Sequence, residues 1–281
     1  MNTKNRIILT RIVTAYILLF LLLRFFLHVT PSRLLQPPLS NGYMDITYWA
    51  FRVSGILNFI VAHQTVAVLF DLLLFSTAIL TLFFPLKRRF IIPFSLLLFL
   101  LALIYNNYSL HHNQTMAGFM IVLFAFWPRD NEKSFFLWQG VRYLTCLIYP
   151  LSFFWKTVYG KAFYYWPQGI GSAKANLVEY MYVNPESSFT SVIKWFLQHS
   201  WILNAGTTMI VLMELLMLTG LFTKKYDRIL FWFPVIIHVS TYFFADVLYY
   251  ELLVMDISLL SMLQINTIGK RLPLLSLGSH L

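Results

Sequence analysis

Residues 65–86 read TVAVLFDLLLFSTAILTLFFPL, a long apolar run in which Asp71 is the one charged residue. About 20 apolar residues in a helix are enough to cross the ~30 Å hydrocarbon layer of a membrane. The basic triplet Lys87, Arg88 and Arg89 follows directly. An apolar run that ends in basic residues is typical of a membrane span with its end in the cytoplasm. The stretch therefore predicts a transmembrane helix.

The rest of the chain has the same character. Its 281 residues are 59% apolar and only 11% charged, whereas a soluble domain has roughly 25% charged residues. So few charges cannot cover a water-facing surface. We predict an all-α fold, a polytopic transmembrane helical bundle with interfacial helices, as one domain over residues 1–281. About eight spans are expected, at 8–28, 65–86, 90–108, 113–128, 136–157, 201–222, 228–247 and 250–266.

Basic residues occur in every second connection between these spans, which predicts cytoplasmic N- and C-termini. The net charge of +10 is divided among these short clusters rather than gathered in one patch, so membrane lipid and not nucleic acid is the expected partner. A bacterial inner membrane or the ER membrane would suit such a chain. The first apolar run, interrupted by Arg24, shows no small-x-small cleavage site and is expected to stay as an uncleaved span.

Two longer segments on the opposite side also show helical spacing. Residues 43–62 are expected to lie at the interface or to re-enter the membrane. Residues 171–183 and 187–199 predict two amphipathic helices, separated where Pro185 breaks the first helix and a serine caps the second. Trp195 and Trp201 suit the headgroup level.

A charge in the middle of a span costs a few kcal/mol by insertion scales, so it should face the interior of the bundle. Residues of this kind are Asp71, Arg142, Glu214, His238 and Asp256. Glu214 and His238 lie near the middle of consecutive spans and could approach each other, either to exchange a proton or only to join two helices. Arg142, near a cytoplasmic end, could also snorkel to the surface.

The predicted outer turn NNYSLHHN (106–113) gathers asparagines and histidines. It could line a substrate entrance or be only a solvated loop. The single cysteine, Cys146, excludes an intramolecular disulfide and a cysteine-based metal site. The histidines are scattered, and no metal site is predicted.

The stretch SFFWKTVYGKAFYYWPQG (152–169) places Lys156 and Lys161 at the outer end of the fifth span. Lys156 could snorkel to the surface. Aromatic neighbours withdraw an amine from water and lower its pKa, which is how a lysine becomes a general base near neutral pH. From the residues alone, Lys161 is either such a base or an anchor in an aromatic belt.

The block Lys161-Ala-Phe-Tyr-Tyr-Trp166-Pro-Gln-Gly169 resembles a block of the vitamin K-dependent γ-carboxylase membrane domain, which also defines the wider HTTM family (horizontally transferred transmembrane domains). An Asn/His pair before a glycine-containing apolar span, here HHNQTMAGFMIVLFAFWP, and a Glu span followed by a His span agree with it. The resemblance covers about residues 43–263. The family has Asn before His at the turn, whereas His112 precedes Asn113 here, so either His111 or His112 would match.

The resemblance implies an integral membrane enzyme that uses a reduced vitamin K-type quinol, O2 and CO2 to carboxylate glutamate in a secreted peptide or protein. It implies Lys161 as the base. The further catalytic residues would be His112, Glu214 and His238. The residues that bind the quinol or substrate would be Trp155, Tyr164, Tyr165, Trp166, Asn107 and Asn113. The chain would be a short form without the large extra-membrane domain that holds a protein substrate.

Two other functions remain open. One is a non-enzymatic membrane helper in the maturation of, or immunity to, a secreted peptide. The other is a quinone-linked redox or transport module in which Asp71, Glu214 and Asp256 relay protons. No internal repeat of the transporter type is visible in the sequence.

Overall fold

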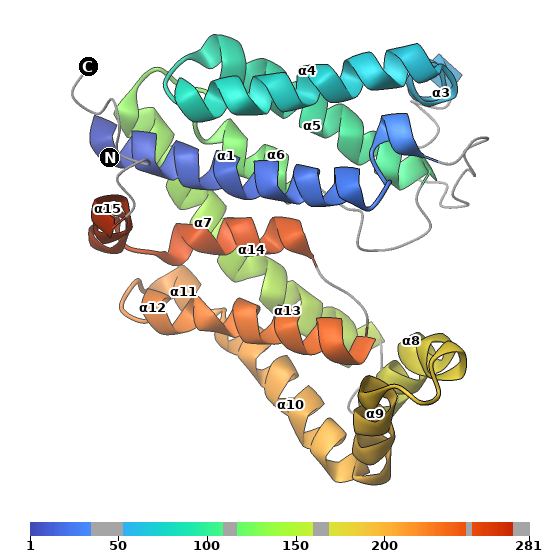
Figure 1. Ribbon diagram of the computed structural model, residues 1–281. Helices are drawn as coiled ribbons and strands as arrows, with labels where there is room; N and C mark the ends of the chain where they lie inside the picture. Colours follow the sequence, from blue (N-terminus) through green and yellow to red (C-terminus); the bar gives the residue numbers. More distant parts are fainter. Residues whose placement is uncertain (35–52, 109–116, 160–168, 246–248, 272–281) are drawn as a thin grey trace. The chain divides into compact units, whose positions relative to one another are not determined.

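The computed structural model describes residues 1–34, 53–108, 117–159, 169–245 and 249–271 (Figure 1). Over these ranges every regular element is a helix, which confirms the predicted all-α class. The chain divides into two compact units, Met1–Val141 with Tyr250–Leu281 (unit 1) and Arg142–Tyr249 (unit 2).

Unit 1 is built around three long helices, α1 (Thr3–Phe26), α4 (Gln64–Phe83) and α5 (Arg88–Tyr108). Helix α4 contacts both α1 and α5 (Figure 1). The shorter elements are η1 (Pro31–Arg33), α3 (Ile56–Ala62), α6 (Ala117–Phe124), the first part of α7 (Asn131–Phe154), α14 (Tyr250–Asp256), η4 (Ile257–Leu259) and α15 (Met262–Arg271).

The first basic cluster of the sequence is partly structural. Arg6 is buried in unit 1 and its guanidinium donates to the carbonyls of Phe126 (3.0 Å), Pro128 and Arg129 (2.9 Å). These carbonyls lie between α6 and α7, where the helices leave backbone acceptors without partners. One of the charges that predicted a cytoplasmic loop therefore holds the loop that follows α6.

Unit 2 contains the second part of α7 and the π-helical turn η3 (Trp155–Tyr159). The elements that follow are α8 (Gly169–Val183), α9 (Ser188–Gln198), α10 (Ser200–Leu216), α11 (Thr219–Phe222), α12 (Asp227–Leu230) and α13 (Trp232–Ala245). The predicted pair of helices is confirmed by α8 and α9, of which α9 is the clearly amphipathic one. The hydroxyl of Ser187 caps α9 by accepting a bond from the Thr190 amide at 3.0 Å, as expected of an N-cap serine.

Four segments of the described residues are long and apolar enough to cross a membrane, at Thr3–Arg33, Gln64–Phe83, Arg88–Tyr105 and Ser200–Phe222. The predicted count of about eight spans is not supported. Helix α6 has 8 residues and α13 has 14, so they reach only about 12 and 21 Å against the ~30 Å of hydrocarbon. Helix α7 has 24 residues but carries Glu132, Lys133 and Arg142 within its length.

Arg142 does not snorkel to a surface. It is buried and forms a two-pronged ion pair with Asp227, with Nε to Oδ2 at 2.8 Å and Nη2 to Oδ1 at 2.5 Å. Its Nη2 also donates to the Thr223 carbonyl at 3.1 Å. The planar guanidinium fits a carboxylate in this way, and the pair fixes α7 to α12 within unit 2.

Candidate functional site: an ion pair beside an apolar cavity

Three polar side chains lie along one face of the second half of α7 and the turn after it. Tyr149 and Ser152 belong to α7, and Lys156 belongs to η3. Their spacing of three and then four residues places them on the same side of a helix. This polar stripe faces two buried groups from other helices of unit 2, Glu214 on α10 and His238 on α13.

Glu214 is held by two members of the stripe. Lys156 Nζ donates a hydrogen bond to Oε1 of Glu214 and forms an ion pair with it. Ser152 Oγ donates to the same oxygen at 3.2 Å. The Glu214 side chain is only 3% exposed, against 36% for Lys156. The other carboxylate oxygen, Oε2, is buried and has no hydrogen-bond partner among the described residues, so the carboxylate can accept one more donor.

His238 is held by the third member of the stripe. Its Nε2 lies 3.0 Å from the Tyr149 hydroxyl, and both side chains are buried. Its Nδ1 is buried as well and has no hydrogen-bond partner in the described part of the chain. Glu214 and His238 thus bind the same face of α7 through different partners, about one to two helical turns apart. No direct hydrogen bond between them occurs in this structure.

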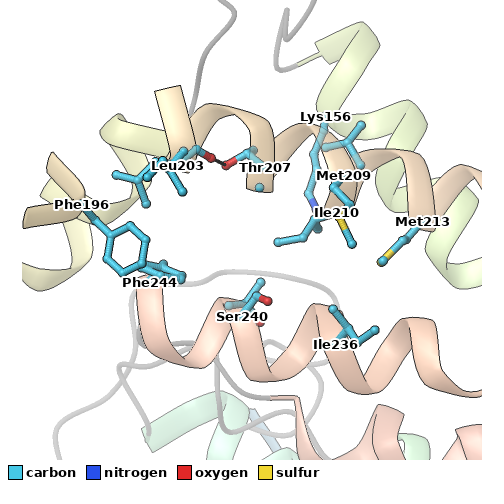
Figure 2. Close-up of a pocket in the computed structure, with 14 residues that line it drawn as sticks. Lys156, Phe196, Leu203, Thr207, Met209, Ile210, Met213, Ile236, Ser240 and Phe244 are labelled. Carbon is cyan, nitrogen blue, oxygen red and sulfur yellow. Dashed lines mark hydrogen bonds between the residues drawn. The ribbon is translucent and has the colours of Figure 1, made fainter. Parts of the chain in front are cut away.

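Lys156 also lines a cavity of about 370 Å³ between α10 and α13. Lys156 and Met213 lie at one end of the cavity, and Phe196 and Phe244 lie at the other (Figure 2). The wall between them is mostly aliphatic, and its polar groups are the hydroxyls of Thr207, Ser240 and Thr241.

The helical period explains why the ion pair meets this cavity. Leu203, Thr207 and Ile210 line the cavity, and Glu214 continues their series at the spacing i, i+4, i+7, i+11. Residues at this spacing share one face of a helix. Glu214 therefore lies on the same side of α10 without lining the cavity itself, and the amine of Lys156 joins its carboxylate to the cavity wall.

The two threonine hydroxyls in the cavity wall already donate their protons to backbone carbonyls. Thr207 donates to the Leu203 carbonyl at 2.8 Å, and Thr241 donates to the His238 carbonyl at 3.1 Å. A hydroxyl has one proton to donate, so each of these oxygens offers only its lone pairs to a ligand. The cavity thus combines an apolar wall, hydrogen-bond acceptors and one ionisable pair.

Several predicted site residues lie outside the described residues: Lys161, His112, Tyr164, Tyr165, Trp166 and Asn113. Asn107 falls within α5, but its side chain is not described. Trp155 lies in η3, is 66% exposed and does not line the cavity. The described residues contain no group of three His, Cys, Asp or Glu side chains that could hold a metal ion.

Sequence reasoning missed Tyr149, Ser152 and above all Lys156, for which the apolar run before it suggested only that the side chain could snorkel to the surface. The signal that could have found them is the stripe Tyr149, Ser152, Lys156. Three polar residues on one face of an otherwise apolar helix need partners on a neighbouring helix.

No protein-family model matches the chain, and neither the curated proteins nor the solved structures give a match. The similarity of the Lys161–Gly169 block to the γ-carboxylase membrane domain therefore stays a prediction from the sequence.

Proposed function

We propose that this chain is an integral membrane protein that binds a lipid-soluble quinol in the cavity of unit 2, with the Lys156–Glu214 pair moving a proton to or from the bound ligand. The observation that carries the proposal is an ionisable pair at one end of an apolar cavity. The four long apolar helices support a membrane setting.

The lining fits a quinol in size and polarity. Cavities that bind small molecules usually measure about 300–1,000 Å³ and combine apolar walls with a few polar groups, and this one measures about 370 Å³. The lone pairs of Thr207 and Thr241 can accept bonds from the two hydroxyls of a quinol. A quinone has carbonyls in their place and cannot donate to these two oxygens, so the threonines favour the reduced form.

The ion pair would handle the proton. Glu214 holds the Lys156 amine at the cavity wall, within reach of a ligand in the cavity. In this proposal the amine passes its proton along the hydrogen bond to the carboxylate and then accepts one from a ligand hydroxyl. The unpartnered Oε2 of Glu214 offers a second place for that proton.

For the reaction class, we propose the carboxylation that the sequence resemblance implies. A bound quinol, with O2, supplies a base strong enough to remove a γ-proton from glutamate, and the resulting carbanion takes up CO2. In that scheme Lys161 and Lys156 are alternative candidates for the lysine that first deprotonates the quinol. The substrate is a glutamate in a secreted peptide or protein.

The first test is quinol binding by the full chain in nanodiscs, under anaerobic reducing conditions. Gly206 lines the cavity, and a Cβ at this position meets no atom within 4 Å. Gly206→Leu should therefore fill the cavity without displacing backbone and weaken naphthoquinol binding at least about tenfold. Gly171→Leu is the matched control, because Gly171 is equally unhindered and exposed but lies outside the cavity.

Equal binding by wild type and Gly206→Leu would place the ligand elsewhere. Absence of binding to the folded wild type would favour the membrane helper for a secreted peptide. If binding holds, epoxide formation and uptake of labelled CO2 into a glutamate peptide test the reaction. Comparing Lys156→Ala with Lys161→Ala then shows which lysine is the base.

A further inference from the structure

The cavity of unit 2 is open along one side, between α10 and α13. Three residues of its lining are also exposed, Gly206 and Met209 on α10 and Ile236 on α13. Met209 is 53% exposed and Ile236 is 39% exposed. Figure 2 shows these two side chains on the helices that border the cavity. The cavity therefore has a side opening with Gly206, Met209 and Ile236 at its rim.

Each of the two helices carries an exposed apolar stripe that passes through this rim. The stripes consist of Ala205, Met209, Leu212 and Leu216 on α10 and of Trp232, Ile236, Val239 and Phe243 on α13. Both follow the spacing i, i+4, i+7, i+11, so the members of a stripe share one face of their helix. Neither stripe contains a charged or polar residue. The side opening thus lies between two continuous apolar surfaces.

The membrane-spanning character of α10 indicates what these surfaces meet. The whole α10 stripe belongs to the segment Ser200–Phe222, which is long and apolar enough to cross a membrane. Lipid tails are as apolar as leucine, so exposed aliphatic side chains on such a segment can face them at no cost. Because the α13 stripe borders the same opening, we expect the opening to face hydrocarbon rather than water.

The wall inside the opening suits a hydrocarbon chain. It is mostly aliphatic, and the hydroxyls of Thr207 and Thr241 already donate to backbone carbonyls. The amine of Lys156 is bound to Glu214. These three polar groups of the wall have partners within the protein. An apolar wall that faces empty space forfeits its dispersion contacts, and a flexible chain from the adjacent lipid can supply them.

We propose that an acyl chain of a membrane lipid enters through this side opening and occupies the cavity when no other ligand is bound. The occupant is a chain of the surrounding bilayer, because the opening lies between two surfaces that face lipid. A quinol would have to displace the chain, which rests on the proposed function; occupation by the chain itself does not.

Photoreactive lipids test this with the full chain in nanodiscs. The discs contain phosphatidylcholine with a diazirine near the middle of one acyl chain, and peptide mass spectrometry locates the adducts after irradiation. Ser240 lines the cavity, whereas its neighbour Val239 is exposed and does not line it. This pair of residues therefore compares the cavity with the lipid-facing surface of the same helix. Wild type should give adducts at both.

A substitution at the rim separates the two positions. Gly206→Leu has room for its side chain, since a Cβ there meets no atom within 4 Å. It should reduce the adducts at Ser240 at least about fivefold, because a leucine at the rim takes the space of the chain. The adducts at Val239 should stay unchanged, which also shows that the variant is folded and inserted. Gly171→Leu, outside the cavity, should change neither position.

Adducts at Val239 without adducts at Ser240 in the wild type would overturn the proposal, as would equal Ser240 adducts in wild type and Gly206→Leu. Naphthoquinol added under anaerobic reducing conditions should lower the Ser240 adducts if the proposed function is right. If quinol leaves them unchanged while Gly206→Leu removes them, the acyl chain occupies the cavity and the proposed ligand is wrong. If quinol binds but Ser240 never gives adducts, the proposed function stands and the acyl chain does not.

Discussion

Lys156 and Glu214 form a hydrogen-bonded ion pair although 58 residues separate them in the chain. The pair joins the turn after α7 to the last turn of α10, and its two members differ widely in exposure. This difference makes the consequences of breaking the pair unequal for the two residues.

We expect Lys156→Met to destabilise the protein by about 3 kcal/mol, because it leaves the buried Glu214 carboxylate without a cation. Glu214→Gln should cost about 1 kcal/mol, since the glutamine oxygen can still accept a hydrogen bond from Lys156, whose side chain is only partly enclosed by protein. The double variant Lys156→Met/Glu214→Leu should recover most of the loss. Unfolding in mixed SDS micelles measures all three, and equal costs for the two single variants would contradict the assigned burial.

The buried pair of Arg142 and Asp227 should be sensitive to the shape of the cation as well as to its charge. Arg142→Lys keeps the charge but cannot bind both carboxylate oxygens in the same plane. We expect a loss of about 2 kcal/mol for Arg142→Lys and about 3 kcal/mol for Asp227→Asn. Glu186→Gln, at an exposed position between α8 and α9, is the control and should change the free energy of unfolding by less than about 0.5 kcal/mol. An unchanged free energy of unfolding in Arg142→Lys would show that the two-pronged geometry is unimportant.

Gly220 and Cys146 should show strong coupling. A Cβ on Gly220 would lie 2.4 Å from Cys146 Sγ and 3.0 Å from Leu230 Cδ1, so Gly220→Ala should cost about 2 kcal/mol through overpacking. Cys146→Ala removes the nearer atom, and the double variant should be at least about 1 kcal/mol more stable than the sum of the single losses predicts. Strict additivity in the same unfolding assay would argue against this contact.

The contact between Tyr149 and His238 should affect stability but not the cavity. Tyr149→Phe leaves Nε2 of the buried His238 without its partner and should cost about 1–3 kcal/mol. His238 does not line the cavity, so naphthoquinol binding should be unchanged. Tyr182→Phe, at a highly exposed position, is the neutral control. Weaker naphthoquinol binding by Tyr149→Phe would connect this pair to the cavity.

Local rules predicted the local features of this fold. The break at Pro185 and the serine cap separate α8 from α9 as expected, because turns and caps depend on a few neighbouring residues. The apolar runs that became α1, α4, α5 and α10 were also found. The predicted number of spans is not supported, because apolar content alone does not show where a helix ends. Helix α14 ends at Asp256 after 7 residues, although the apolar pattern continues.

The candidate site, too, was predicted only in part from the sequence. Glu214 and His238 were selected from the sequence because a charged or polar group within an apolar run needs a partner. The sequence could not show which partner each residue takes. The expected antiparallel spans suggested only that Glu214 and His238 could face each other. The structure instead gives Glu214 to Lys156 and Ser152, and His238 to Tyr149.

The sequence by itself determined that this is an all-helical protein with apolar helices suited to a membrane, because composition and helical periodicity act residue by residue. Only the tertiary structure decided that Arg6 and Arg142 are buried, that Lys156 is a partner rather than an anchor, and that α10 and α13 leave a cavity between them. These features depend on which helix faces meet and how closely, and that is set by side chains far apart in the chain.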